Sequence, residues 1–130
     1  MRPRSGSAYR ILVVDDEPDI IPVIRRYMLR EGFLLDDFTD SELAVQQFKP
    51  DFYDLALLDI RMPKLNGFDL YRQLKMRDDN LKVCFLTAYE LYFNDFRKTF
   101  PEIRISCFIK KPVELKMLAM SIRGTLDSAD

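Results

Sequence analysis

Polar residues stand at the carboxyl ends of the apolar runs in this 130-residue sequence. They are Asp15 and Asp16 after ILVV, Asp59 after LALL, Thr87 after CFL, and Lys110 and Lys111 after CFI. Carboxylates that meet in a folded chain repel one another unless a cation lies among them. A carboxylate can also attack a phosphoryl group, whose charge a metal ion, an ammonium group and a hydroxyl group stabilise. These residue types therefore indicate metal-assisted transfer of a phosphoryl group to an aspartate.

Mg²⁺ is the metal ion that suits this set of residues, because carboxylates, backbone carbonyls and waters fill its octahedral shell. The sequence has no histidine and only two cysteines, which disfavours a zinc site. Cys84 and Cys107 lie within apolar runs. We therefore expect both to be buried free thiols rather than a disulfide.

Length and composition exclude several other classes of protein. Hydrophobic residues make up 48% of the chain, which is enough for one core. The net charge of -1 does not favour binding to nucleic acid, which depends on lysine and arginine. The chain has no apolar run long enough to span a membrane, and MRPRSGSAYR at its start has no secretory apolar segment. We expect a single cytoplasmic domain without nucleic-acid or membrane contact.

Apolar runs rich in β-branched residues alternate with segments of helical periodicity. Strands are predicted over residues 9–16, 32–38, 53–59, 82–87 and 104–110, and helices over 18–30, 39–48, 66–77, 89–100 and from 112 onward. The third strand is evenly apolar, so both of its faces should be covered. Five strands that alternate with five helices predict an α/β fold with a doubly wound parallel sheet.

Specific residues mark the ends of these helices. Gly32 is expected to end the first helix, and Pro22 leaves open whether that helix starts late or bends. Thr39 is the expected N-cap of the second helix, with Glu42 completing a capping box. Asn66 should cap the third helix. The expected apolar faces are Ile20, Ile24, Tyr27 and Met28 in the first helix, and Leu115, Leu118, Ala119 and Ile122 in the last, with Pro112 in its first turn.

Doubly wound sheets bind ligands beyond the carboxyl ends of their strands. The polar residues at the strand ends are therefore expected to converge on one edge of the sheet. We expect one domain over residues 10–125, preceded by a flexible arm at 1–9 and followed by a tail at 126–130.

Four stretches together identify a resemblance to a known family. ILVVDDEPDI, LALLDIRMPKLNGFDLYRQLK, CFLTAY and CFIKKP resemble, in this order, the receiver domain of two-component response regulators. The resemblance covers about residues 10–124. It implies a flavodoxin-like, five-stranded parallel sheet with strand order 2-1-3-4-5 and five helices. It also implies a cis peptide bond between Lys111 and Pro112.

The resemblance assigns a role to each matching residue. Asp59 is the implied phospho-acceptor, and Asp15 and Asp16 are the implied metal-binding acids. The main-chain carbonyl of Arg61 is expected to complete the protein's share of the Mg²⁺ ligands, to which Asp59 also contributes. Thr87 matches the switch hydroxyl, Lys111 the phosphate-binding lysine and Phe108 the switch aromatic residue. No organic cofactor is implied.

The resemblance also implies partners and a mode of action. The chain is expected to act as a stand-alone receiver domain, phosphorylated by a sensor histidine kinase or a phosphotransfer protein. It would then bind a downstream protein effector, and it would be a signalling switch that promotes its own phosphorylation and dephosphorylation rather than an enzyme. A homodimer through the fourth helix, fifth strand and fifth helix is a further expectation.

Each assignment has a structural alternative. Asp15 and Asp16 could cap the following helix, the lysine pair could be solvated charge, and Phe108 could be a core residue. Two other functions also remain open. The chain could be a receiver-like binding module that does not use phosphorylation, or, with less support, an aspartyl-phosphate phosphohydrolase. Asp59 lacks the Asp-x-Asp pattern of such hydrolases, because Ile60 and Arg61 follow it.

The fourth predicted helix departs from the family pattern. The segment between Thr87 and Lys111 is longer than is usual, and residues 89–100 are the most aromatic stretch of the chain. These rings could face the core or form a partner surface. Arg61 and Tyr89 are expected to flank the path of attacking water and to slow hydrolysis of the aspartyl phosphate.

Overall fold

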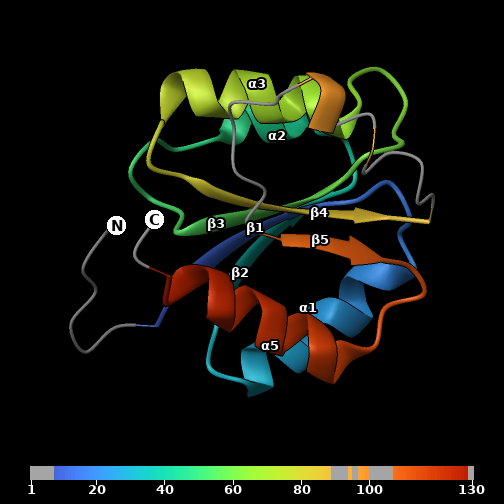
Figure 1. Cartoon of the computed structure of the whole chain (residues 1–130), viewed down its shortest axis with the longest axis vertical. Helices are drawn as coiled ribbons and strands as arrows, with labels where there is room; N and C mark the ends of the chain where they lie inside the picture. Colours follow the sequence, from blue (N-terminus) through green and yellow to red (C-terminus); the bar gives the residue numbers. More distant parts are fainter. Residues whose placement is uncertain (1–7, 89–93, 95–96, 100–106, 129–130) are drawn as a thin grey trace.

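The computed structural model describes residues 8–88, 94, 97–99 and 107–128 of the chain (Figure 1). Its five strands are β1 (Arg10–Val14), β2 (Leu34–Phe38), β3 (Leu55–Asp59), β4 (Lys82–Thr87) and β5 (Cys107–Lys110). They form one parallel sheet in the order β2-β1-β3-β4-β5. The predicted fold class and strand order are confirmed.

Helices cover both faces of this sheet. Helices α2 (Ser41–Gln47) and α3 (Gly67–Arg77) lie on one face, and α1 (Ile20–Arg30) and α5 (Leu115–Leu126) lie on the other (Figure 1). Every residue of β3 is buried, as the even apolar character of this strand predicts. None of the described helices is long and apolar enough to cross a membrane.

Side-chain alternation along the strands divides the core into two clusters. Leu12 and Val14 of β1 pack toward α2 and α3, whereas Ile11 and Val13 pack toward α1 and α5. This period of two follows from the pleat of a strand. Cys84 and Cys107 are buried and free in the second cluster, as predicted.

Helix α1 starts later than the sequence pattern indicates. It begins at Ile20, so Pro22 lies in the first turn. Backbone N–H groups in the first turn have no acceptor within the helix, so the lack of an N–H in proline removes no helical hydrogen bond. Ile21, rather than Ile20, is buried together with Ile24 and Met28. Gly32 follows the helix with φ +95°, a conformation that glycine adopts without steric cost.

The predicted N-cap of α2 is wrong by one residue. Asp40, not Thr39, is the N-cap, and its carboxylate accepts hydrogen bonds from the N–H groups of Glu42 (2.9 Å) and Leu43 (3.3 Å). A single carboxylate thus binds two amides that would otherwise have no partner in the helix. The prediction for α3 is confirmed, because Asn66 accepts from the N–H of Asp69 at 2.9 Å.

The last helix also begins later than predicted. Helix α5 starts at Leu115 after the N-cap Glu114, so Pro112 precedes the helix instead of occupying its first turn. The Lys111–Pro112 peptide bond is cis, as the resemblance implies. The predicted fourth helix and the start of the fifth predicted strand fall mostly outside the described residues, although residues 97–99 are helical. The division into arm, domain and tail stays a prediction.

Candidate functional site

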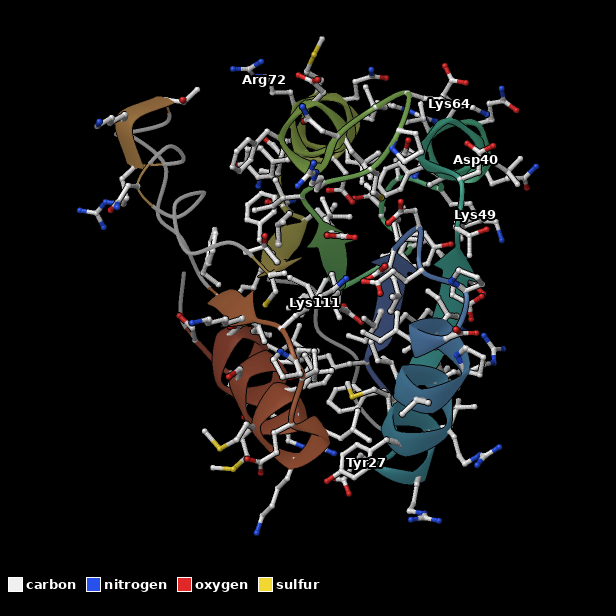
Figure 2. The ribbon with its side chains drawn as sticks, turned by 90° about the vertical axis from the view of Figure 1, so that its right-hand side faces the viewer. Tyr27, Asp40, Lys49, Lys64, Arg72 and Lys111 are labelled. Carbon is white, nitrogen blue, oxygen red and sulfur yellow. The ribbon has the colours of Figure 1, made fainter. Side chains whose placement is uncertain are left out.

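A pocket of about 530 Å³ lies at the edge of the sheet formed by the carboxyl ends of the strands. Figure 2 views the molecule from this edge. The lining of the pocket comes from the last residues of β3 and β4 and from the loops that follow β1, β3, β4 and β5. It consists of Asp16, Glu17, Asp59, Arg61, Met62, Pro63, Thr87, Ala88 and Lys111. Parallel strands place their carboxyl ends on one edge, so residues far apart in sequence meet there. Five of the residues that the sequence singled out therefore share one pocket.

Three carboxylates form a cluster at this pocket. Asp15, Glu17 and Asp59 each offer an oxygen atom, and these atoms lie within 4.8 Å of one another. Asp15 and Asp59 are buried, whereas Glu17 is exposed. Asp15 Oδ1 also accepts a hydrogen bond from the Glu17 N–H at 2.9 Å, which holds the turn after β1. Glu17 was not predicted as a site residue, although its position directly after two acidic residues was the available signal.

Lys111 brings a positive charge to this cluster. Its Nζ lies 3.1 Å from Asp15 Oδ2 and 3.4 Å from Asp59 Oδ2, and it donates a hydrogen bond to Glu17 Oε1. Figure 2 shows Lys111 in the middle of the molecule, between the two helix layers. The backbone N–H of Lys111 also donates a hydrogen bond to the backbone carbonyl of Thr87 at 2.7 Å, which fixes the loop after β5 to the end of β4. The neighbouring Lys110 is exposed.

Burial and charge alter the protonation of these groups. Burial and, to a smaller extent, the negative charge of Asp15 together raise the pKa of Asp59 to about 7, against the opposing effect of Lys111. Burial by itself lowers the pKa of Lys111, but its polar contacts with the Glu17 and Asp15 carboxylates more than compensate and raise it. The site therefore holds a lysine that stays charged beside a carboxyl group that resists ionisation.

The donor atoms of the cluster fit a divalent cation that prefers oxygen. Asp15 Oδ2 is buried and accepts no hydrogen bond within the described part of the chain, although the Lys111 ammonium group lies close to it. A fully buried carboxylate oxygen that accepts no hydrogen bond is costly even with an ammonium group nearby. A cation beside Asp15 and Asp59 would stabilise it, and a set made only of oxygen atoms suits Mg²⁺ rather than zinc.

The other predicted residues take different places around the cluster. Asp16 lines the pocket and is close enough to Asp59 for a hydrogen bond between the two carboxyl groups to contribute to the raised pKa of Asp59. Thr87 and Arg61 line the same pocket. Phe108 does not line this pocket. The centroid of its ring lies 6.0 Å from the centroid of the Phe85 ring in the core.

The backbone after Asp59 passes very close to the start of α3. A Cβ atom built on Gly67 would lie 2.4 Å from the carbonyl oxygen of Asp59 and 2.7 Å from Cα of Ile60. The Gly67 N–H donates to the Ile60 carbonyl at 2.8 Å, which closes the loop. Gly67 thus lets the start of α3 pack directly against the end of β3.

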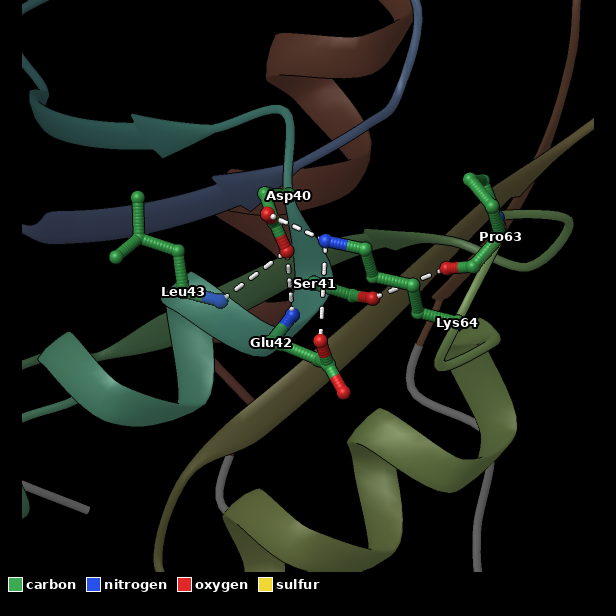
Figure 3. A network of polar contacts seen from close by, with 6 residues as sticks. All are labelled: Asp40, Ser41, Glu42, Leu43, Pro63 and Lys64. Carbon is green, nitrogen blue, oxygen red and sulfur yellow. Dashed lines mark hydrogen bonds and ion pairs between the residues drawn. The ribbon is translucent and has the colours of Figure 1, made fainter.

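Polar contacts also fix this loop to α2 (Figure 3). Lys64, which has φ 69°, forms ion pairs with Asp40 at 3.1 Å and Glu42 at 3.8 Å. Ser41 Oγ donates to the Pro63 carbonyl at 3.4 Å. The N-terminus of α2 and the loop that follows β3 are therefore held together on the surface.

Comparison with known proteins identifies a family. A family model described as the response regulator receiver domain matches residues 11–123. The response regulator TrrA of Thermotoga maritima, whose crystal structure is a complex with Mg²⁺ and BeF, is 28% identical with a TM-score of 0.76 over 90% of this chain and 98% of its own. The CheY-like receiver domain protein of Methanospirillum hungatei is 26% identical with a TM-score of 0.79, over 93% and 95%.

Curated relatives show the same similarity over part of their length. The transcriptional regulatory protein RprY of Bacteroides fragilis is 29% identical over 117 residues, which are 90% of this chain and 49% of RprY. The response regulator SaeR of Staphylococcus aureus is 28% identical over 116 residues, or 89% of this chain and 50% of SaeR. The chain thus spans about half the length of these relatives.

Proposed function

Because this chain belongs to the response regulator receiver domain family, we propose that it is a signalling switch phosphorylated on Asp59. One observation carries the proposal: the Asp59 carboxylate ends the central strand β3 and lies in the pocket with Lys111 Nζ 3.4 Å away. Receiver domains are signalling switches rather than turnover enzymes. The proposal adds Mg²⁺-dependent phosphoryl transfer to this residue, promoted by the domain itself.

In the proposed transfer, an Asp59 Oδ atom forms a new bond to phosphorus. The bond from phosphorus to the donor nitrogen of a phosphohistidine, or to the oxygen of a small phosphodonor, breaks, and its electron pair leaves with the donor. The residues that would hold Mg²⁺ are Asp15, Asp16 and Asp59 with the carbonyl of Arg61. Bound Mg²⁺ would supply positive charge that offsets the charge of the approaching phosphoryl oxygens.

The product adds negative charge and acceptor oxygens at Asp59. Lys111 offers an ammonium group to these oxygens, and Thr87 offers a hydroxyl group from the end of β4. Because the Lys111 N–H is bonded to the Thr87 carbonyl, movement of one loop affects the other. We propose that this shift changes the packing of Phe108 on β5 and thereby the affinity for a partner protein.

The proposed partners are a sensor histidine kinase or a phosphotransfer protein, and a downstream protein effector. A homodimer that uses β5 and α5 is part of the proposal, and α5 exposes Met117 and Met120 on its surface. The fourth helix of the expected dimer interface lies mostly outside the described residues. Two buried free cysteines support a cytoplasmic location. Since RprY and SaeR are about twice as long, stand-alone action stays a prediction and the proposal concerns this domain.

Intact mass measured after incubation with Mg²⁺ and acetyl phosphate tests the proposal. We expect one added phosphoryl group, which is absent in Asp59→Asn and after chelation of the metal. Lys111→Met should reduce the adduct, whereas the matched variant Lys110→Met should behave like the wild type, because Lys110 lies outside the pocket. Absence of an adduct with both acetyl phosphate and a kinase would favour a binding module that does not use phosphorylation. Turnover of small phosphoesters would favour a phosphohydrolase.

A further inference from the structure

Lys111 contacts three carboxylates that differ strongly in exposure. The side chains of Asp15 and Asp59 are 0% and 6% exposed, whereas that of Glu17 is 59% exposed. All three lie within ion-pair distance of the same ammonium group. An ammonium group has three N–H donors. In the unphosphorylated protein these three carboxylates are therefore enough to engage every donor of Lys111.

Phosphorylation of Asp59 converts its carboxylate into an acyl phosphate and frees the donor that contacted it, but the phosphoryl group brings three acceptor oxygens that also compete for the two remaining donors. In the metal-free protein, separating Lys111 from Asp15 would leave a fully buried carboxylate without its counter-charge, which is strongly unfavourable. Releasing Glu17 costs far less, because an exposed carboxylate regains water as it leaves the lysine. Among the described partners of Lys111, Glu17 is thus the one that can be exchanged.

We propose that Glu17 is the releasable partner of Lys111, which holds the ammonium group at rest and yields it to the phosphoryl oxygens. This inference rests on the proposed phosphorylation of Asp59. Glu17 is a positioning residue in this scheme, since it acts through Lys111. It also lines the pocket, so its negative charge opposes an incoming anion. Both effects make Glu17 an inhibitory residue that favours the unphosphorylated state.

The proposal predicts the effect of removing this charge. Glu17→Gln should bind beryllofluoride, a stable mimic of the phosphoryl group, about two- to fivefold more tightly than the wild type, as expected for loss of one exposed ion pair. Because the Glu17 side chain is exposed, the variant should fold normally. Asp19→Asn is the matched control: Asp19 is an exposed acid in the same segment, and among the described residues it makes no ion pair with Lys111.

The experiment compares three proteins at saturating Mg²⁺. The melting temperature of each protein is first measured at increasing Mg²⁺ concentration without beryllofluoride, which gives the saturating concentration. Amide chemical shifts then give the dissociation constant of beryllofluoride. Tighter binding by Glu17→Gln, with Asp19→Asn equal to the wild type, supports the proposal. Unchanged or weaker binding by Glu17→Gln, or an equal gain in Asp19→Asn, overturns it and leaves phosphorylation of Asp59 intact. A wild-type protein that binds no beryllofluoride would overturn the proposed function itself.

Discussion

Replacing Asp59 with asparagine should stabilise the metal-free domain at neutral and alkaline pH. The ordinary pKa of the carboxyl group is 3.8, whereas burial and the charge of Asp15 raise it to about 7 in the folded protein. Between these values the folded state keeps a proton that the unfolded state has lost. The free energy of unfolding therefore falls as the pH rises through this window, and it stays low above it. Asparagine has the same shape and no charge to bury.

The size of the effect follows from the two pKa values. Each pKa unit corresponds to about 1.4 kcal/mol, so a rise from 3.8 to about 7 sets a ceiling of roughly 4 kcal/mol. Lys111 can move and water can enter the pocket, and both lower the cost of the buried charge. We therefore expect Asp59→Asn to raise the free energy of unfolding by about 2 kcal/mol at about pH 8.

Urea unfolding in the presence of a chelator measures this difference. The chain has no tryptophan, so far-ultraviolet circular dichroism is the suitable signal. The advantage of the variant should shrink as the pH is lowered from about 8 to about 5. Added Mg²⁺ should stabilise the wild type more than Asp59→Asn, because a ligand stabilises the folded state to which it binds. Equal stability of the two proteins at alkaline pH, or a difference that does not change with pH, would refute the reasoning.

Two further predictions concern the local structure around the site. Gly67→Ala should lower the free energy of unfolding by about 1–3 kcal/mol and slow phosphorylation by acetyl phosphate, because the new Cβ would meet the Asp59 carbonyl at 2.4 Å. Gly124→Ala is the control, because a Cβ atom at Gly124 would meet nothing within 4 Å and alanine favours a helix, so the free energy of unfolding should stay the same or rise. Equal losses of stability in the two variants would contradict this explanation. Asp40→Ala should lower the free energy of unfolding by about 1 kcal/mol in urea unfolding. Thr39→Ala should leave the free energy of unfolding nearly unchanged. A larger loss of stability in Thr39→Ala than in Asp40→Ala would instead identify Thr39 as the N-cap of α2.

Local sequence patterns predicted the fold because the relevant signals are short in range. Apolar runs that alternate with helical segments indicate parallel strands joined by crossover helices, and this topology places all carboxyl strand ends on one edge. Asp59, Thr87 and the pair Lys110 and Lys111 could therefore be assigned to one edge from the sequence, and the family resemblance selected Lys111 from that pair. The boundaries were less certain where two neighbouring residues could both act as a cap, as Thr39 and Asp40 show.

The role of a residue in a loop was harder to predict, because it depends on contacts that periodicity does not encode. Glu17 and Lys111 are 94 positions apart, and nothing in either local sequence indicates that they form a hydrogen bond. The same holds for Gly67, whose close approach to the Asp59 carbonyl follows from how α3 packs on β3. Asp54 is a further case, since it is buried and accepts from the Arg10 N–H at 2.8 Å.

The sequence by itself thus determined the order of elements, the sheet edge that carries the site and the chemical types of its residues. These follow from periodicity and from polar residues at the ends of apolar runs, which are properties of short segments. Only the tertiary structure decided which carboxylates meet, which of them lose contact with water and which of them contact Lys111. Burial and charge separation arise when distant loops are packed together, and they set the pKa of Asp59 and the exposure of Glu17.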